Sequence, residues 1–368
     1  MSQKPYYFHL PRELLAAEPA YPRDTSRIFV YDTATDSIQF DHFLNIDKYL
    51  PAKSILVLNK TRVAPSRIIL SKPTGGKVIC LFLLNELMKD ANTIRAMVDR
   101  KIEIGDALCL TEPSRAPKQL MTCVSHDEES IFLFKLHVSR NTLFKILDEH
   151  GSMPIPLYLR HTSLTANELR QRYQTIYAKS SSESYHGVEA EIASVAAPTA
   201  GLHFTPRVFQ KLKQKAIATT EVILEVGLGT FAPLSDEALQ KGKLHVELYQ
   251  VPEPSGNLIS DTKSSGGRVI AVGTTVVRTL ESFARLSKAS VPEFDIYYPT
   301  DIFIRTGHTF ELVDSLITHF HLPESSLIML VDAFLQHKDA KRDVMDLYKI
   351  AIDQKFRFYS FGDSMIIL

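Results

Sequence analysis

The chain has 368 residues, of which 45% are hydrophobic, 23% charged and 9% aromatic. This length exceeds that of one ordinary domain, so we expect two, and the composition is that of a folded protein with a sizeable core and not of a disordered chain. Lys and Arg number 42 and Asp and Glu also number 42, so no global positive field attracts a polyanion. Any contact with nucleic acid must use a local basic patch, although charge runs on helices are more often solvated faces. The candidate basic residues are Lys60, Arg62, Arg67, Lys211, Lys213 and Lys215.

The cysteines and the first residues bear on the cellular compartment. Cys80, Cys109 and Cys123 are widely spaced, with no C-x-x-C pair to bind zinc or an iron–sulfur cluster, which is typical of a reducing compartment. The segment MSQKPYYFHLPRELL has no apolar stretch of signal-peptide length, and no apolar run approaches the roughly 20 residues of a membrane span. We therefore expect a cytoplasmic protein that does not contact a membrane.

The type of secondary structure that the sequence predicts changes twice along the chain. Residues 55–58 form a short apolar strand that ends in the polar segment 59–62. From about 67 to 138, short β-type runs alternate with turns, which favours a small barrel or sandwich. The run LFKILDEHG predicts a helix that ends at Gly151, and strands and helices alternate after it, which indicates an α/β layer. The polar, Ser-rich segment 180–191 predicts a surface loop.

These observations predict a two-domain fold of the mixed α+β or α/β class. We expect a discontinuous α/β catalytic domain of residues 1–62 and 139–368. We expect residues 63–138 to form a small antiparallel β-barrel that is inserted into this domain.

The segment SVAAPTAGLHFT, residues 194–205, combines small residues with two polar groups. Its alanine and glycine residues let a ligand approach the backbone, while Thr199 and His203 supply a hydroxyl and an imidazole. Thr205 is a good N-cap for a helix whose first residue is Pro206. The segment predicts a ligand site, although a close-packed turn with a hydrogen-bonded core histidine fits the same residues.

Two glycine-containing loops follow predicted strands later in the chain. In RVIAVGTTVVR a buried strand leads through one glycine into Thr274 and Thr275 at the start of a helix. Free amides and the helix dipole there predict an anion site, and N-capping by a threonine is the alternative. Gly227 and Gly229 follow the strand VILEV and permit close approach to a flat ring, but they lack the remaining parts of a dinucleotide fingerprint.

Histidines and carboxylates recur in the C-terminal half. His245 and Glu247 alternate on a predicted strand, so both would point to one face and cooperate in proton transfer, or would lie on a half-buried surface. A third ligand is not evident, so these two residues do not predict a metal site. The segment THFHLP places His321 before a helix, with Asp314 upstream. These side chains suit acid–base work near neutral pH, and capping and packing explain them almost as well.

Taken together, these segments resemble one family almost end to end. It is the family of the S-adenosylmethionine:tRNA ribosyltransferase-isomerases of queuosine biosynthesis. The resemblance runs from about Leu10 to Ile367. The matching stretches are LPRELLAAEP, YPRDTSR, LVLNKTRVAPSR, SKPTGGKV, RYQTIYAK, SVAAPTAGLHFT, EVGLGTFAPL, GGRVIAVGTTVVRTLES, TDIFIRTGHTFELVDSLITHFHLPESSLIMLVDAF and FRFYSFGDSMII.

The resemblance implies a reaction and its substrates. Such an enzyme joins the ribosyl part of S-adenosylmethionine to the aminomethyl group of 7-aminomethyl-7-deazaguanine at the wobble position of tRNA, and adenine and methionine leave. The product is epoxyqueuosine, whose epoxide-bearing cyclopentane is the isomerised ribose. The resemblance further implies a barrel inserted into an α/β domain and the tRNA anticodon arm as partner. It implies no metal or redox cofactor, because S-adenosylmethionine is a consumed cosubstrate, and we expect a monomer.

The implied reaction assigns roles to the singled-out residues. A base must remove a proton from the ribose 5′ carbon, which the sulfonium makes acidic, and an acid must protonate the departing adenine. The predicted acid–base residues are His203, His245, Glu247, Asp314 and His321. The predicted substrate-binding residues are Arg67, Thr199, Gly227, Gly229, Thr274, Thr275 and Arg278. Among these, the threonines and the arginine at 278 would hold the methionine carboxylate or a tRNA phosphate.

The sequence departs from the family pattern at several positions. Lys60 stands where an acidic or amide residue is usual, and Ile79 where a glutamate is common. Glu225 stands in place of a usual histidine and His319 in place of a common asparagine. Another histidine of the pattern is missing, and residues 180–191 look inserted. These departures bear on substrate affinity and on the acid–base assignment more than on the reaction class.

Two other functions compete with this interpretation. A Rossmann-type methyltransferase would use the same cosubstrate, but the chain has no N-terminal strand followed by a Gly-rich loop. A β-barrel module that only binds RNA is the non-enzymatic alternative, and the small aromatic content and zero net charge count against it. Release of adenine, of S-adenosylhomocysteine or of neither distinguishes the three.

Overall fold

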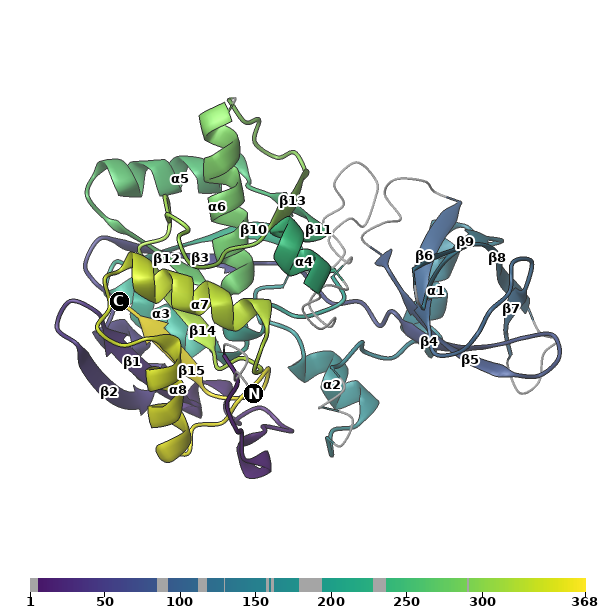
Figure 1. Ribbon diagram of the computed structural model, residues 1–368, viewed down its shortest axis with the longest axis horizontal. Coiled ribbons are helices and arrows are strands. Elements are labelled where there is room, and N and C mark those ends of the chain that lie inside the picture. Colours follow the sequence, from purple (N-terminus) through teal and green to yellow (C-terminus); the bar gives the residue numbers. More distant parts are fainter. Residues whose placement is uncertain are drawn as a thin grey trace.

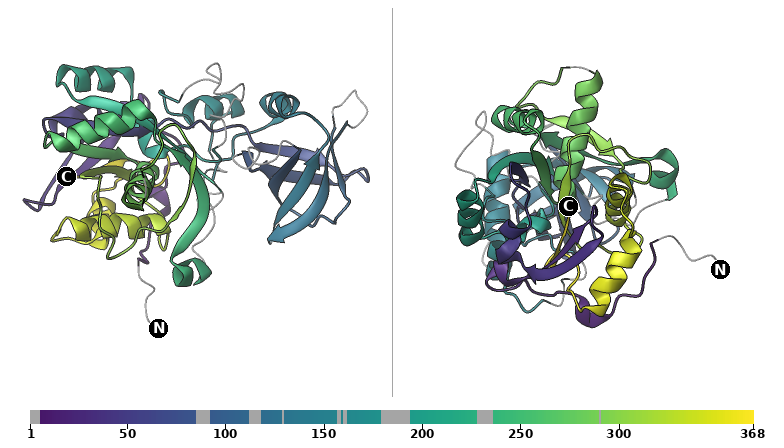
Figure 2. Two further views of the ribbon diagram at one scale, coloured as in Figure 1. Left: turned by 90° about the horizontal axis from the view of Figure 1, so that it is seen from above. Right: turned by 90° about the vertical axis from the view of Figure 1, so that its left-hand side faces the viewer.

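The chain folds into two lobes that lie side by side (Figure 1). Within the described residues, the larger lobe contains a nine-stranded sheet with helices on both faces, and the smaller lobe is a closed barrel. The view from above in Figure 2 shows the same separation, with the barrel at one end of the molecule. The computed structural model describes residues 6–84, 92–111, 118–128, 130–156, 159, 162–178, 194–227, 236–289 and 291–368.

The large sheet has the strand order β13-β11-β10-β3-β12-β14-β15-β1-β2. Its central strands β10, β3, β12 and β14 run parallel, and β1 is parallel to β15. The sequence SILVLN of β3 is buried at every residue, as is typical of a parallel strand covered on both faces. The strands are β1 (Arg27–Asp32), β2 (Ser37–His42), β3 (Ser54–Asn59), β10 (Ala218–Glu225), β11 (Lys243–Gln250), β12 (Arg268–Val272), β13 (Tyr298–Ile302), β14 (Ser315–His319) and β15 (Ser364–Ile367).

Helices cover the two faces of this sheet and form two apolar clusters with it. Along β3, Ile55 and Val57 belong to one cluster and Leu56 and Leu58 to the other, because successive side chains of a strand point to opposite faces. The first cluster packs under α5, α6, α7 and α8, and the second under η3, η6 and α3. The helices outside the barrel lobe are η1 (Arg12–Leu14), η2 (Arg23–Thr25), η3 (Phe43–Lys48), α2 (Ala166–Arg172), η6 (Thr199–His203), α3 (Pro206–Gln214), α4 (Asp236–Lys241), α5 (Glu253–Ser264), α6 (Thr274–Ala289), α7 (Ser326–His337) and α8 (Val344–Asp353).

The smaller lobe is a closed antiparallel barrel with the strand order β4-β5-β6-β9-β8-β7. Its strands are β4 (Arg67–Ser71), β5 (Lys77–Phe82), β6 (Thr93–Val98), β7 (Ala107–Leu110), β8 (Lys118–Glu128) and β9 (Ile131–Leu136). The predicted mixed α/β class with an inserted barrel is therefore confirmed.

One helix belongs to the barrel by its packing. α1 (Arg140–His150) ends before Gly151, as predicted, and its side chains Leu143 and Leu147 share one apolar cluster with the barrel strands. This packing extends the barrel lobe past residue 138, through the end of α1. The domain boundaries at 62/63 and 138/139 stay a prediction.

A short segment joins the two lobes. Val195 packs against Leu81 and Leu83 of the barrel, and its N–H donates to the carbonyl of Val226, just beyond the end of β10, at 2.9 Å. The neighbouring Ser194 pairs with Val63 in an isolated β-bridge. The barrel is thus tied to the end of β10, where the candidate site begins. Among the described residues, no helix combines the length and apolar character needed to cross a membrane.

Candidate active site

The carboxyl ends of the parallel strands meet at one edge of the large sheet. β3 ends at Asn59, β10 at Glu225, β12 at Val272 and β14 at His319. Ligands of open α/β sheets bind in the crevice outside these ends. We therefore expect the predicted site residues at this edge of the sheet.

Two segments that the sequence singles out meet at this edge. Gly273, which follows β12, has φ +93°, a conformation that favours glycine. A Cβ added to Gly273 would lie 3.5 Å from Cβ of Ala200 in η6 and 3.6 Å from Oγ1 of Thr275. η6 thus packs on the loop that starts α6, which brings Thr199 and His203 to the same place as Thr274 and Thr275.

Four side chains form a hydrogen-bonded row at this edge. Ser26 Oγ lies 2.7 Å from His203 Nδ1, and His203 Nε2 lies 2.7 Å from His319 Nε2. At the other end, His319 Nδ1 lies 3.1 Å from Thr199 Oγ1. His203 and His319 are only 5% and 3% exposed, so water does not compete freely for these bonds. We call these four residues the histidine row.

Both imidazoles of the histidine row are neutral at neutral pH. Burial lowers the pKa of His203 to about 4. Burial, together with the nearby His203, lowers the pKa of His319 well below its usual range. Since the two Nε2 atoms share one hydrogen bond, one must carry the proton and the other must accept it. In one arrangement His203 Nε2 donates to His319, and in the other His319 Nε2 donates to His203. Moving protons along the row, between Ser26 and Thr199, interconverts the two.

His321 lies near the histidine row but belongs to another set of contacts. Its Nε2 lies 3.3 Å from Thr318 Oγ1, and its Nδ1 lies 3.3 Å from the hydroxyl of Tyr348 in α8. The backbone N–H of His321 also donates to this hydroxyl at 2.8 Å. Burial lowers the pKa of His321 to about 3, so this imidazole is neutral as well.

A second polar cluster joins β10, β11 and α6. Arg278 Nη1 donates to Glu247 Oε2, and the Gly227 N–H donates to Glu247 Oε1 at 2.9 Å. The Arg278 and Glu247 side chains are 8% and 2% exposed. Among the described residues, Nε and Nη2 of Arg278 have no hydrogen-bond partner, and neither has Oγ1 of Thr275, which lies one turn earlier on α6. The Nε–Nη2 edge is a pair of parallel donors of the kind that a carboxylate or phosphate accepts, so this cluster presents an anion site.

His245 and Glu247 do not share one environment. The pairing of β11 with β13 shifts register between Lys243 and Glu247. His245 is exposed, whereas Glu247 is buried. Such a shift of register disturbs the alternation of side chains that the sequence suggests. Only Glu247 of this pair joins the anion site.

Asp314 lies at the opposite edge of the sheet, because it precedes β14 whereas His319 ends it. Its carboxylate accepts from the N–H of Val269 at 2.8 Å and from Lys263 Nζ at 3.0 Å. The structure therefore does not bring Asp314 together with the histidine row, and these contacts give it a structural role.

We expect Asp314→Ala to lower the free energy of unfolding by about 1–3 kcal/mol, because the buried Val269 amide loses its acceptor. The turnover number should not change. Denaturant titration and steady-state kinetics on the same preparation measure both quantities. A drop in turnover without a loss of stability would return Asp314 to the acid–base residues.

Of two further predicted residues, one lies away from this edge of the sheet and the other lies outside the described residues. Arg67 begins β4 of the barrel, where its backbone pairs with Ser152 and its Nη2 lies 3.5 Å from the carbonyl oxygen of Ile155. Arg67 is thus placed at the root of the barrel. Gly229 lies outside the described residues, as does the predicted loop of residues 180–191.

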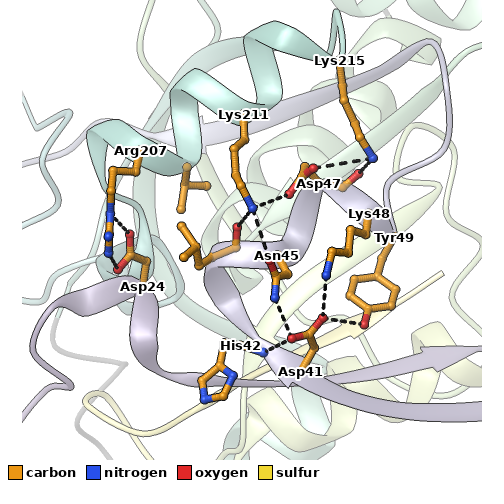
Figure 3. Close-up of polar contacts among 12 residues, drawn as sticks. Asp24, Asp41, His42, Asn45, Asp47, Lys48, Tyr49, Arg207, Lys211 and Lys215 are labelled. Atoms are coloured by element: carbon orange, nitrogen blue, oxygen red, sulfur yellow. Dashed lines mark hydrogen bonds and ion pairs between the residues drawn. The ribbon is translucent and has the colours of Figure 1, made fainter.

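The basic residues of α3 face acidic partners within the protein (Figure 3). Lys211 Nζ donates to the carbonyl of Leu44 at 2.9 Å and lies 3.5 Å from the Asp47 carboxylate. Lys215 Nζ donates to the Asp47 carbonyl at 2.9 Å and lies 3.5 Å from the other carboxylate oxygen. Lys211 and Lys215 therefore share the one carboxylate of Asp47, which offsets part of their charge, while Lys213 is exposed.

We expect the double variant Lys211→Ala and Lys215→Ala to weaken tRNA binding less than twofold. It should lower the free energy of unfolding by about 1 kcal/mol, because partly exposed ion pairs contribute little. The salt dependence of tRNA affinity should not change, since released counterions report contacts with phosphates. A fall in that slope by about two would place both lysines on the nucleic acid instead.

Three residues of the edge were not selected from the sequence as site residues: Ser26, His319 and Glu225. Glu225 is 1% exposed, and neither carboxylate oxygen has a hydrogen-bond partner in the described ranges of the chain. Burial raises the pKa of Glu225 to about 8, against the opposing charge of Arg140. The sequence signals were the position of Glu225 and His319 at strand ends and their departure from the family pattern. Ser26 carries no comparable signal, because its partner is 177 positions away.

The fold is that of a two-lobed α/β protein with an inserted barrel, and the described part of the site has the imidazoles and unpaired donors that an enzyme acting on an anionic substrate needs. A family model described as "Queuosine biosynthesis protein" matches residues 3–367. The chain belongs to this family.

Relatives of known name cover the whole chain. One from Thermotoga maritima is 39% identical over 370 residues, and one from Thermoanaerobacter sp. is 38% identical over 368 residues, each alignment covering 100% of both chains. Both are named S-adenosylmethionine:tRNA ribosyltransferase-isomerase. A crystal structure of S-adenosylmethionine tRNA ribosyltransferase from Thermotoga maritima is similar over 99% of each chain, with 31% identity and a TM-score of 0.52. These comparisons confirm the predicted family and enzyme class.

Proposed function

We propose that this chain transfers the ribosyl part of S-adenosylmethionine to 7-aminomethyl-7-deazaguanine in the anticodon arm of tRNA and isomerises it, giving epoxyqueuosine, adenine and methionine. The observation that carries the proposal is the position of the histidine row beside the start of α6, at the carboxyl edge of the sheet. This position supports proton transfer and anion binding at the same edge of the sheet. The reaction needs both.

The anion site of Arg278 and Thr275 supplies the binding part. A carboxylate accepts two parallel hydrogen bonds from the open Nε–Nη2 edge of Arg278 and a third from Thr275 Oγ1. The positive end of the α6 dipole adds to the attraction. The methionine carboxylate of S-adenosylmethionine has this chemistry, and a tRNA phosphate shares it.

The histidine row supplies the proton-transfer part. The reaction begins when a base removes a proton from the ribose 5′ carbon, which the sulfonium acidifies. Every ring nitrogen of the row already takes part in a hydrogen bond, so the substrate proton enters through a terminal hydroxyl, Thr199 or Ser26, which passes its own proton to the neutral imidazole beside it. The row then passes charge between Thr199 and Ser26, so that an N–H or O–H is available to protonate the departing adenine. We assign these steps to His203 and His319.

The reaction products test the proposal directly. Purified protein is mixed with S-adenosylmethionine and tRNA that carries the precursor base, and the small molecules are separated by chromatography. Adenine and methionine in equal amounts, with mass added to the tRNA, are expected. S-adenosylhomocysteine would indicate a methyltransferase, and tRNA binding without either product would indicate an RNA-binding module. tRNA with guanine at the wobble position is the matched control, because it lacks the acceptor amine.

We further propose that S-adenosylmethionine is consumed without a resident cofactor, and that the enzyme is a cytoplasmic monomer. Treatment with a metal chelator followed by gel filtration should leave turnover unchanged, because the reaction moves protons and breaks C–S and C–N bonds without a redox step. Light scattering on the same column measures the mass of the eluting species, for which one chain is expected. Loss of turnover that is restored by a divalent metal would contradict the first part.

A further inference from the structure

Glu225 carries a buried carboxyl group that the fold itself does not use. It is the last residue of β10, it is 1% exposed, and within the part of the chain that the structure describes neither Oε1 nor Oε2 has a hydrogen-bond partner. Buried polar groups in folded proteins are almost always hydrogen-bonded, because leaving one unpaired costs roughly 1–3 kcal/mol. Such a group at the ligand-binding edge of a sheet calls for a partner that comes from outside the chain.

The register of β10 shows which face of the sheet Glu225 occupies. Glu221 pairs with Leu58 of β3, whose side chain belongs to the cluster beneath η6 and α3. Val222 and Leu224 belong instead to the cluster beneath α6. Because Glu225 lies four residues after Glu221, it projects from the same face as Glu221, toward the side on which η6 lies.

This face of β10 ends at the junction of the two lobes. Val226, next to Glu225, donates its N–H to Ser194 Oγ at 2.9 Å and accepts from the N–H of Val195, which packs on the barrel. The charge of Arg140, the first residue of α1 in the barrel lobe, acts on Glu225. The neighbouring strands carry two more charged residues close to Glu225: Glu247 of β11, next to Leu248, which pairs with Glu225, and Lys60, whose N–H donates to the carbonyl of Val222.

We propose that Glu225 binds a primary ammonium group of a substrate. An ammonium brings three N–H donors and a positive charge, which satisfy both carboxylate oxygens and offset the cost of ionising a buried acid. This rests on the proposed function, in which two substrates carry such a group. They are the aminomethyl group of the tRNA base and the α-amino group of S-adenosylmethionine. A buried carboxyl group at this position prefers a cationic ligand.

Binding then releases a proton. The free Glu225 carboxyl, with its pKa at about 8, holds its proton at neutral pH. When the ammonium binds, that proton passes to solvent, the carboxylate accepts N–H bonds, and no covalent bond to carbon changes. Below pH 8 the affinity for the ammonium ligand therefore rises with pH, by about tenfold between pH 6 and pH 7, and it levels off above pH 8.

Calorimetry on the full chain tests this proposal with Glu225→Gln and the matched control Glu221→Gln, which lies on the same face of β10. S-adenosylmethionine and precursor tRNA are each titrated at pH 7 in two buffers of different ionisation enthalpy, which counts the protons released. Wild type and Glu221→Gln should release about one proton with one of the two ligands. Glu225→Gln should release none with that ligand, and at pH 8 should bind it about 10- to 100-fold more weakly.

Two analogues identify the source of the ammonium. Loss of proton release with tRNA that has guanine at the wobble position assigns the aminomethyl group. Loss of proton release with an S-adenosylmethionine analogue lacking the α-amino group assigns that substrate. Equal melting temperatures of wild type and Glu225→Gln at pH 6, where the carboxyl is protonated, confirm that the variant is folded.

Absence of proton release from wild type with both ligands overturns the proposal, as does wild-type affinity of Glu225→Gln for both. These readouts do not depend on turnover. If wild type binds both ligands but liberates no adenine, the proposed reaction fails while the proton count still decides the role of Glu225. If wild type binds neither ligand, both proposals fail.

Discussion

Replacing His203 by Gln is expected to lower kcat by about 10²- to 10⁴-fold, the usual contribution of a general acid or base. Gln retains a donor and an acceptor for Ser26 and His319, so the variant should stay folded, but its amide does not accept a proton near neutral pH. The KM for S-adenosylmethionine should change little, because the anion site is intact. Single-turnover measurement of adenine release, with saturating tRNA, separates the chemical step from product release.

His319→Ala and Ser26→Ala extend this test along the histidine row. His319→Ala removes the second imidazole and should also lower kcat by at least about tenfold, whereas Ser26→Ala removes one hydrogen bond at the end of the row and should have the smaller effect. His319→Asn, which restores the residue common in the family, should recover part of the activity. Full activity of both His203→Gln and His319→Ala would remove the row from the mechanism.

Arg278→Ala is expected to lower the free energy of unfolding by about 3–5 kcal/mol. The variant leaves the Glu247 carboxylate buried without its cationic partner, and such unpaired charges are among the most destabilising changes in a protein. It should also raise the KM for S-adenosylmethionine, because the open Nε–Nη2 edge is lost. Denaturant titration measures the first effect, and kinetics at varied S-adenosylmethionine concentration measure the second.

A double variant separates the effect of this pair on protein stability from its effect on S-adenosylmethionine binding. Replacing both Arg278 and Glu247 by Leu removes the two charges together, so most of the stability should return while S-adenosylmethionine binding stays weak. Recovery of binding in the double variant would show that Arg278 serves only to neutralise Glu247. The Gly227 amide, which then loses its acceptor, accounts for any remaining loss of stability.

The sequence predicted the parts of the fold that depend on local pattern. The buried runs of β3 and β12, the end of α1 before Gly151 and the N-cap Thr205 of α3 follow from periodicity and from capping preferences. The cap is direct, since Thr205 Oγ1 accepts from the N–H of Val208. Each of these features depends on residues that are close together along the chain, so the local sequence is enough to predict it.

The site was harder to predict because long-range packing assembles it. Sequence order places Asp314 and His319 close together, but β14 separates them by its full length and carries them to opposite edges of the sheet. The bulge in β11 separates His245 from Glu247, although strict alternation would unite them. Conversely, the sequence predicts Thr199 and His203 as site residues but not their partner His319. This histidine comes close to them only because η6 packs on the loop after β12.

The position of β15 has a consequence for the way the chain reaches this structure. β1 and β2 join the sheet only through β15, since Ile28 pairs with Ser364 on one side of that strand and His319 pairs with Ser364 on the other. During synthesis, β1 therefore has no strand partner on that side until β15 has been made. Pairing between such distant segments is slow and leaves strands open to aggregation. We therefore expect the newly made chain to depend on chaperones until β15 pairs with β1.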